Sequence, residues 1–146
     1  AQGSVSPLVS FHASAKLLLA AAHREEGRML GRIVAGGGPP DALLTSYRQG
    51  LSRALARPLR TGPCVDSLMH AFGYFKKQLT PDEKALFLDD LEEFSSGRTS
   101  MGACRALIQA WTVRFSTSYL SDQLLLNPFP RALESLEDSS GGRRGS

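Results

Sequence analysis

The sequence predicts an all-α fold, a compact bundle of six to seven helices, and three observations support this. Apolar residues recur at spacings of three and four in six or seven separate segments, which is the period of an amphipathic helix. No stretch alternates apolar and polar residues for long enough to predict a strand. Hydrophobic residues make up 42% and charged residues 21% of the 146 residues, which is typical of a globular domain and not of a disordered or fibrous chain.

Glycine and proline divide the first half of the chain into segments. Residues 1–7 are expected to be a flexible lead-in, followed by a first helix over residues 8–22 and a second over residues 24–35. The run GGGPP at residues 36–40 ends the second helix, because Gly and Pro stop helices and favour turns. A third helix is then expected over residues 41–55, with arginines on its exposed side.

A fourth helix is expected over residues 63–79, after a loop in which Thr61 is a candidate N-cap. Its apolar side is predicted to face the core through Val65, Leu68, Met69, Phe72, Phe75 and Leu79. Its other side carries a stripe at spacings of four, three and four, formed by Asp66, His70, Gly73 and Lys77 with Tyr74 beside them. Because a glycine inside a helix costs about 1 kcal/mol relative to alanine, Gly73 is expected to allow close approach, either of another helix or of a ligand.

The clearest helix start lies at the beginning of the fifth predicted helix. Thr80 is expected to be its N-cap, Pro81 its first residue and Glu83 the second half of a capping box. This helix is predicted to end near Phe94.

Two more helices are expected before the C-terminal tail. The sixth should bury Trp111 together with Leu107, Ile108 and Phe115, since all four share one face. The seventh should begin near Tyr119 and end at Asn-Pro-Phe-Pro, residues 127–130, with Phe129 docking back on the body. The domain is expected to span residues 8–136, and residues 137–146 are expected to be a disordered tail.

Cysteine content argues against a metal centre. Cys64 and Cys104 are the only cysteines in the sequence and form no CxxC motif, so zinc and iron–sulfur sites are not indicated. We expect two buried thiols, no cofactor in this chain and a cytoplasmic location. No apolar run reaches the roughly 18 residues that span a bilayer, so no membrane contact is expected. Catalysis by Cys64 with Asp66 and His70 is disfavoured, because six positions along a helix separate Cys64 and His70 onto different faces.

Charge is segregated along the chain, although the net charge is only +3. Residues 1–80 hold ten Lys and Arg against four Asp and Glu, whereas residues 81–97 hold one Lys against six acidic residues. Phosphate would repel the acidic helix, so we expect this helix to lie away from any nucleic-acid surface. A simpler reading is that the acids complement a helix dipole and the arginines coat exposed faces.

Four segments occur in the order and spacing found in the YbgA-like domain, a bacterial domain of unknown function. They are FHASAKLLLAAA (11–22), MLGRIVA (29–35), LMHAFGYFKKQLTPDEK (68–84) and YLSDQLLLNPFP (119–130). The chain resembles this family over about residues 8–134, and the HxxGYFKK core together with the closing Q-x3-N-P-x-P pattern is distinctive. It departs from the family at Ala15, where a second histidine is usual, and at residues 64–67, where an asparagine is common.

The resemblance implies an accessory role. Such domains occur alone or fused behind a cysteine-rich desulfidase domain, which binds an iron–sulfur cluster and removes sulfur from thiolated uracil or from 4-thiouridine in transfer RNA. The YbgA-like part is implied to bind the RNA. Because the desulfidase cysteines are absent here, the chain is expected to be a non-catalytic module that binds RNA, above all tRNA, beside a fused or separate desulfidase domain.

The expected binding surface joins the first and fourth predicted helices in the basic half of the chain. Its residues are His12, Lys16, His70, Gly73, Tyr74, Lys76 and Lys77. Lysines would contact phosphates, and an exposed tyrosine would stack on an unpaired base. The alternatives are a structural or protein-interaction domain and, least favoured, an enzyme that uses Cys64.

Overall fold

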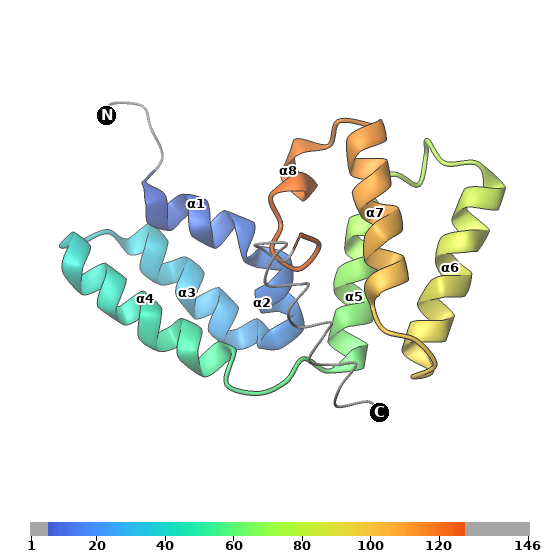
Figure 1. The fold of residues 1–146 in the computed structure, drawn as a ribbon. Helices are drawn as coiled ribbons and strands as arrows, with labels where there is room; N and C mark the ends of the chain where they lie inside the picture. Colours follow the sequence, from blue (N-terminus) through green and yellow to red (C-terminus); the bar gives the residue numbers. More distant parts are fainter. Residues whose placement is uncertain (1–5, 128–146) are drawn as a thin grey trace.

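The computed structural model describes residues 6–127, and eight helices form most of this span (Figure 1). The helices are α1 (Pro7–Ser14), α2 (Lys16–Ala22), α3 (Arg24–Gly36), α4 (Pro40–Ala54), α5 (Thr61–Phe72), α6 (Pro81–Ser95), α7 (Gly102–Arg114) and α8 (Ser118–Ser121). Residues 6–127 contain no strand, so the predicted all-α class is confirmed, with one or two helices more than expected. The expected docking of Phe129 and the tail at 137–146 lie outside the described residues.

The helices form two groups that meet at α2 and α5. Helices α1 to α4, the N-terminal half, lie on one side of Figure 1, and α5 to α8, the C-terminal half, lie on the other. Each half has its own cluster of buried side chains. Helix α2 contributes Leu19 to the N-terminal cluster and Leu17 to the C-terminal cluster, so this short helix joins the two halves.

The C-terminal cluster contains the aromatic core expected from the sequence. Trp111 and Ile108 are buried, and Leu107 and Phe115 pack against the same cluster, as predicted. The capping box at the start of α6 is also confirmed, since Thr80 and Glu83 exchange both hydrogen bonds. Thr61, in contrast, is the first residue of α5 and not its N-cap.

The first predicted helix, over residues 8–22, is broken at Ala15, where φ is −95° and ψ is 0°. An unbroken helix would pair the N–H of Leu17 with the carbonyl of Ala13. Instead the amide of Gln123 lies between these groups: its Oε1 accepts from Leu17 N–H at 3.1 Å, and its Nε2 donates to the Ala13 carbonyl at 2.8 Å. A side chain inserted into the hydrogen-bond ladder bends a helix, so Gln123 explains the break.

The segment that follows α8 is held in place by the same kind of contact. The side-chain Nδ2 of Asn127 donates to the carbonyls of Leu120 at 3.0 Å and Gln123 at 3.2 Å. Gln123 and Asn127 are the first two residues of the Q-x3-N-P-x-P pattern. Both bind backbone groups, so this part of the pattern stabilises the fold.

The fourth predicted helix ends at Phe72 and not at Leu79. After it the chain makes tight turns, in which the N–H of Phe75 donates to the Phe72 carbonyl at 3.0 Å. Phe75 and Leu79 stay buried in these turns, which is why their spacing resembled a helix. Gly73 therefore follows α5, is exposed, and is not approached by a neighbouring helix: a Cβ there would meet the carbonyls of its own preceding turn.

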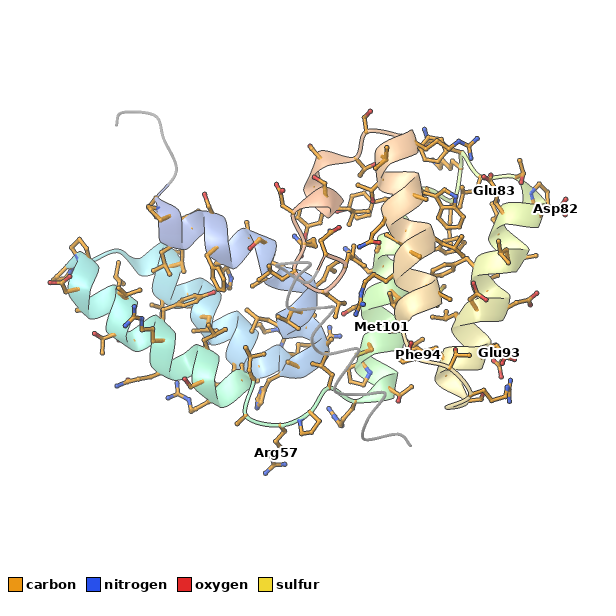
Figure 2. The ribbon with its side chains drawn as sticks, in the orientation of Figure 1. Arg57, Asp82, Glu83, Glu93, Phe94 and Met101 are labelled. Atoms are coloured by element: carbon orange, nitrogen blue, oxygen red, sulfur yellow. The ribbon has the colours of Figure 1, made fainter. Side chains whose placement is uncertain are left out.

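The charge segregation seen in the sequence is also spatial. Figure 2 shows Asp82, Glu83 and Glu93 on α6 at one edge of the molecule, whereas Arg57 extends from the loop between α4 and α5. Helix α6 packs against α5 and α7 and lies at the opposite edge from α4 (Figure 1). Within the described residues, no helix combines the length and apolar character needed to cross a bilayer.

Candidate functional site

The outward face of α2 carries a basic stripe that leads into α3. Leu17, Leu19 and Ala21 of α2 are buried, whereas Lys16 is exposed and the half-buried Ala20 lines the same hollows. The chain turns at the extended residue His23, and Arg24 then begins α3. Lys16 and Arg24 both line a hollow on each side of α2, so these two cations lie at the centre of the site.

The first hollow, the α2–α3 hollow, has a volume of about 270 Å³. It is lined by His12, Lys16, Leu19, Ala20, Arg24, Gly27, Arg28 and Gly31. A Cβ on Gly27 would lie 3.1 Å from the Cβ of Leu19, and a Cβ on Gly31 would lie 3.3 Å from Nε2 of His12. The two glycines therefore let α3 approach α1 and α2 closely, and they leave no side chain of their own in the hollow.

His12 sits at one end of this hollow and is 9% exposed. Its Nδ1 lies 2.8 Å from the hydroxyl oxygen of Tyr47 on α4, and the two rings meet edge to face at 5.7 Å. Burial lowers the pKa of His12, and the Lys16 ammonium lowers this pKa further, whereas burial raises the pKa of Tyr47 to about 12. Both side chains are therefore neutral near pH 7.

The second hollow, the α2–α5 hollow, has a volume of about 300 Å³. Its lining residues are Lys16, Leu17, Ala20, Arg24, Asp66, Ser67 and His70. The buried Ser67 donates to the Leu17 carbonyl at 3.1 Å and so fixes α5 against α2. A smaller hollow of about 220 Å³ continues past Arg24 to Arg60 and Asp66.

Lys16, Arg24 and Arg60 form no ion pair within residues 6–127. Other arginines do: Arg53 pairs with Glu26 at 2.9 Å, and Arg114 pairs with Glu83. No ion pair within the described residues therefore occupies these cations, although the Asp66 carboxylate lines two of the same hollows.

Beyond His70 the site continues into a shallow aromatic area. A wide hollow of about 470 Å³ is lined by Met69, His70, Gly73 and Tyr74. The rings of Tyr74 and Tyr119 stack at 5.6 Å with an angle of 23° between their planes, and 44% of Tyr74 and 37% of Tyr119 are exposed. Burial raises the pKa of Tyr119, with a further increase from Tyr74. Two half-exposed stacked rings offer a flat surface for another ring.

The structure brings together five of the seven site residues expected from the sequence. The linked hollows contain His12, Lys16, His70, Gly73 and Tyr74. Lys76 and Lys77 lie in the turns after α5, are exposed, and line none of these four hollows in the described structure. The Lys76 ammonium lies 6.0 Å from the centre of the Phe72 ring.

Arg24, Arg28, Arg60 and Tyr119 line or adjoin the site but were not expected from the sequence. A spacing of four between Lys16, Ala20 and Arg24 was visible and could have indicated Arg24. Nothing local indicates Tyr119, which reaches Tyr74 through the packing of α8 against α7.

The two thiols line none of the four hollows and are poorly suited to nucleophilic chemistry. Cys64 and Cys104 are free and buried, as predicted. Burial raises the pKa of Cys64, partly offset by Arg105, and burial together with Asp90 raises the pKa of Cys104 to about 11. Both thiols are therefore protonated near pH 7. Residues 6–127 contain no group of three or more His, Cys, Asp or Glu placed to hold a metal ion.

Comparison with known proteins places the chain in a family. A sequence model of the family described as "Protein of unknown function (DUF1722)" matches residues 16–130, which include α2 to α8 and most of the residues around the hollows. Searches of curated proteins and of solved structures return no significant match. With most of its length matched, the chain belongs to the DUF1722 family of proteins of unknown function, which is the YbgA-like family that its sequence resembles.

Proposed function

We propose that the chain binds RNA along the basic face of α2, as a non-catalytic module whose main ligand is tRNA. The observation that carries the proposal is the position of Lys16 and Arg24. Each lines the hollows on both sides of α2, and neither pairs with a carboxylate within the described residues. Binding of phosphates by Lys and Arg releases condensed counterions and supplies most of the sequence-independent affinity for nucleic acid.

The distribution of negative charge supports the same face. The acidic residues of α6 lie at the edge of the molecule opposite the N-terminal half (Figure 2). An RNA strand along α2 would pass the cations without approaching α6. Of the described residues that line the hollows beside α2, Asp66 is the one carboxylate.

Tyr74 and Tyr119 supply a surface for a base, whereas the lysine and arginine contact only phosphates. Single-stranded RNA is recognised largely by stacking of unpaired bases on aromatic side chains. Tyr74 and Tyr119 stack on each other and remain exposed beside the hollow that contains His70 and Gly73. We propose that a base stacks here while the backbone follows Lys16 and Arg24.

The chain's own role in this proposal is recognition. A desulfidase domain, fused or separate, would act on the thiolated base, and the present chain would hold the tRNA beside it in the cytoplasm. The buried, protonated thiols of Cys64 and Cys104 support a role without catalysis.

The test is tRNA affinity measured by fluorescence anisotropy at two or more salt concentrations. Lys16→Ala and Arg24→Ala should each weaken binding and lower the slope of log affinity against log salt by about one. The matched controls are Lys84→Ala on α6 and Arg48→Ala on α4, which remove the same charges from residues outside these hollows.

Tyr74→Ala should weaken binding by about 1 to 3 kcal/mol with little change in the salt slope, because stacking involves no counterion release. A double variant Lys76→Ala/Lys77→Ala asks whether the RNA also passes the turn after α5. If Lys16→Ala/Arg24→Ala binds tRNA as the control double variant does, RNA binding by this face is wrong and a protein-interaction role becomes the better account.

A further inference from the structure

We infer that the α2–α3 hollow is a phosphate-binding pocket in which the Nε2–H of His12 donates to a phosphoryl oxygen. This inference rests on the proposed RNA binding only for the source of the phosphate. An RNA chain and a free nucleotide present the same group, and the experiment below separates them.

The hydroxyl of Tyr47 fixes the protonation of the His12 ring. Tyr47 is 2% exposed, and His12 Nδ1, at 2.8 Å, is the one hydrogen-bond partner of its hydroxyl within the described residues. A buried hydroxyl proton without an acceptor costs roughly 1 to 3 kcal/mol, so the Tyr47 O–H donates to Nδ1. Nδ1 then carries no proton, and the proton of the neutral imidazole is on Nε2.

Nε2 lies beside the hollow and has no hydrogen-bond partner among the described residues. Its neighbour on α3 is Gly31, where a Cβ would lie 3.3 Å away. Within residues 6–127, Nε2 forms no hydrogen bond. Every fully buried side-chain nitrogen or oxygen in these residues has a hydrogen-bond partner. The unpartnered Nε2 is therefore not fully buried and contacts solvent. A histidine that is nine-tenths buried therefore presents one fixed, unused donor to this space.

The other polar groups of the hollow indicate an anion. Lys16, Arg24 and Arg28 line it, and none of the eight described lining residues is acidic. Arg28 has a loose contact of 3.7 Å with Glu25, and both side chains are mostly exposed, so the pair contributes little and leaves Arg28 able to turn toward a ligand.

The shape of the hollow favours phosphate over a smaller or flatter anion. Donors come from α1, α2 and α3, so they approach the hollow from several directions. A phosphate has oxygens that point in several directions, whereas a carboxylate has two oxygens in one plane. The volume of about 270 Å³ exceeds that of a bare phosphate, and the Leu19 and Ala20 wall gives the attached sugar an apolar surface.

The first measurement needs no substitution. Long-range ¹H–¹⁵N NMR spectra of the intact chain report which ring nitrogen of each histidine carries the proton. We expect His12 to be protonated at Nε2, and we expect inorganic phosphate and adenosine monophosphate to shift this signal more than those of His23 and His70. Adenosine and acetate at the same concentrations are the controls. Protonation at Nδ1, or shifts as large with adenosine as with its monophosphate, would overturn the inference.

Variants then test the donor itself. His12→Phe should reduce the affinity for adenosine monophosphate roughly tenfold to hundredfold, the loss of one hydrogen bond to a charged group. His12→Gln, which restores an amide donor near the Nε2 position, should recover part of it. Tyr47→Phe keeps the ring and frees the tautomer, so affinity should fall several-fold while the chain stays folded. Unchanged affinity in both His12→Phe and Tyr47→Phe would contradict the role assigned to this pair.

Competition by tRNA separates this inference from the proposed function. If tRNA displaces adenosine monophosphate and abolishes the His12 shift, the pocket takes a phosphate of RNA. If the nucleotide binds but tRNA does not compete, the phosphate pocket is confirmed with a free nucleotide as its ligand. RNA binding at this hollow is then wrong. If tRNA binding depends on Lys16 and Arg24 but no phosphate compound shifts His12, RNA binding stands and the pocket is wrong.

Discussion

The two halves of the molecule are built on different kinds of core. In the C-terminal half, Phe72 and Phe87 stack with ring centres 4.4 Å apart, and the ring of Trp111 contacts both. In the N-terminal half, Tyr47 belongs to a smaller cluster of buried residues and forms a hydrogen-bonded pair with His12. Dense aromatic packing stabilises one half, whereas the other half has a polar pair beside an open hollow.

This difference indicates that the C-terminal half contributes most of the stability, whereas the N-terminal half holds the polar groups suited to binding. Apolar aromatic cores contribute most to the free energy of unfolding. Polar groups held in fixed positions next to a hollow contribute less to stability but can select a ligand. The basic surface lies where the two halves meet, so α5 supports it from the stable side.

The largest expected effect is in the C-terminal core. Trp111→Ala should lower the free energy of unfolding by about 3 to 5 kcal/mol, because it removes an indole that packs against Phe72, Phe75 and Phe87. Val113→Ala is the control on the same helix, since Val113 is 81% exposed and should change stability by less than about 0.5 kcal/mol. Denaturant unfolding measures both. A loss below about 1 kcal/mol for Trp111→Ala would mean that this half lacks the aromatic core described here.

The next effect concerns the link between the halves. Gln123→Ala leaves the N–H of Leu17 and the carbonyl of Ala13 without their partners, so stability should fall by about 1 to 3 kcal/mol. The N–H of Leu17 should also exchange faster with deuterium. Gln49→Ala on the exposed side of α4 is the control. Unchanged stability and unchanged exchange at Leu17 would show that α1 and α2 can join into one helix without loss.

The smallest expected effect is a pH dependence of the free energy of unfolding, which arises from His12 in the N-terminal half. The folded pKa of His12 is below its ordinary value of 6.5, owing to burial and to Lys16. As pH falls below 6.5, the unfolded chain binds a proton at His12 before the folded chain does, so the free energy of unfolding declines until the folded pKa is passed. Above pH 6.5 His12 is mainly neutral in both states, so the free energy of unfolding no longer changes with pH through this group. His12→Gln should flatten this decline in denaturant titrations at several pH values. An equal decline in His12→Gln would assign the effect to another group.

The features predictable from the sequence are those set by neighbours along the chain. The capping box of Thr80 and Glu83 and the apolar face that buries Trp111 depend on residues three or four apart. The break at Ala15 was missed because its cause, Gln123, lies more than one hundred residues away.

The candidate site was predicted in part for the same reason. Lys16 and His70 were expected from their own helices and do line one hollow. Lys77 was placed on the wrong element, because Phe75 and Leu79 keep a helical spacing through turns that are not a helix. Tyr47 was not expected to fix His12, since only the packing of α4 against α3 brings it there.

RNA binding by the α2 face is best tested by a map of tRNA contacts on the folded chain. Amide ¹H–¹⁵N spectra recorded during a titration with a tRNA anticodon stem-loop or with a tRNA acceptor stem report each residue separately. RNA binding by the α2 face predicts that the shifts concentrate at residues 12–31 and 66–74, around α2 and its hollows, while the amides of α6 do not shift. Shifts centred on α6 or spread evenly over both halves, or no shifts at any salt concentration, would contradict it.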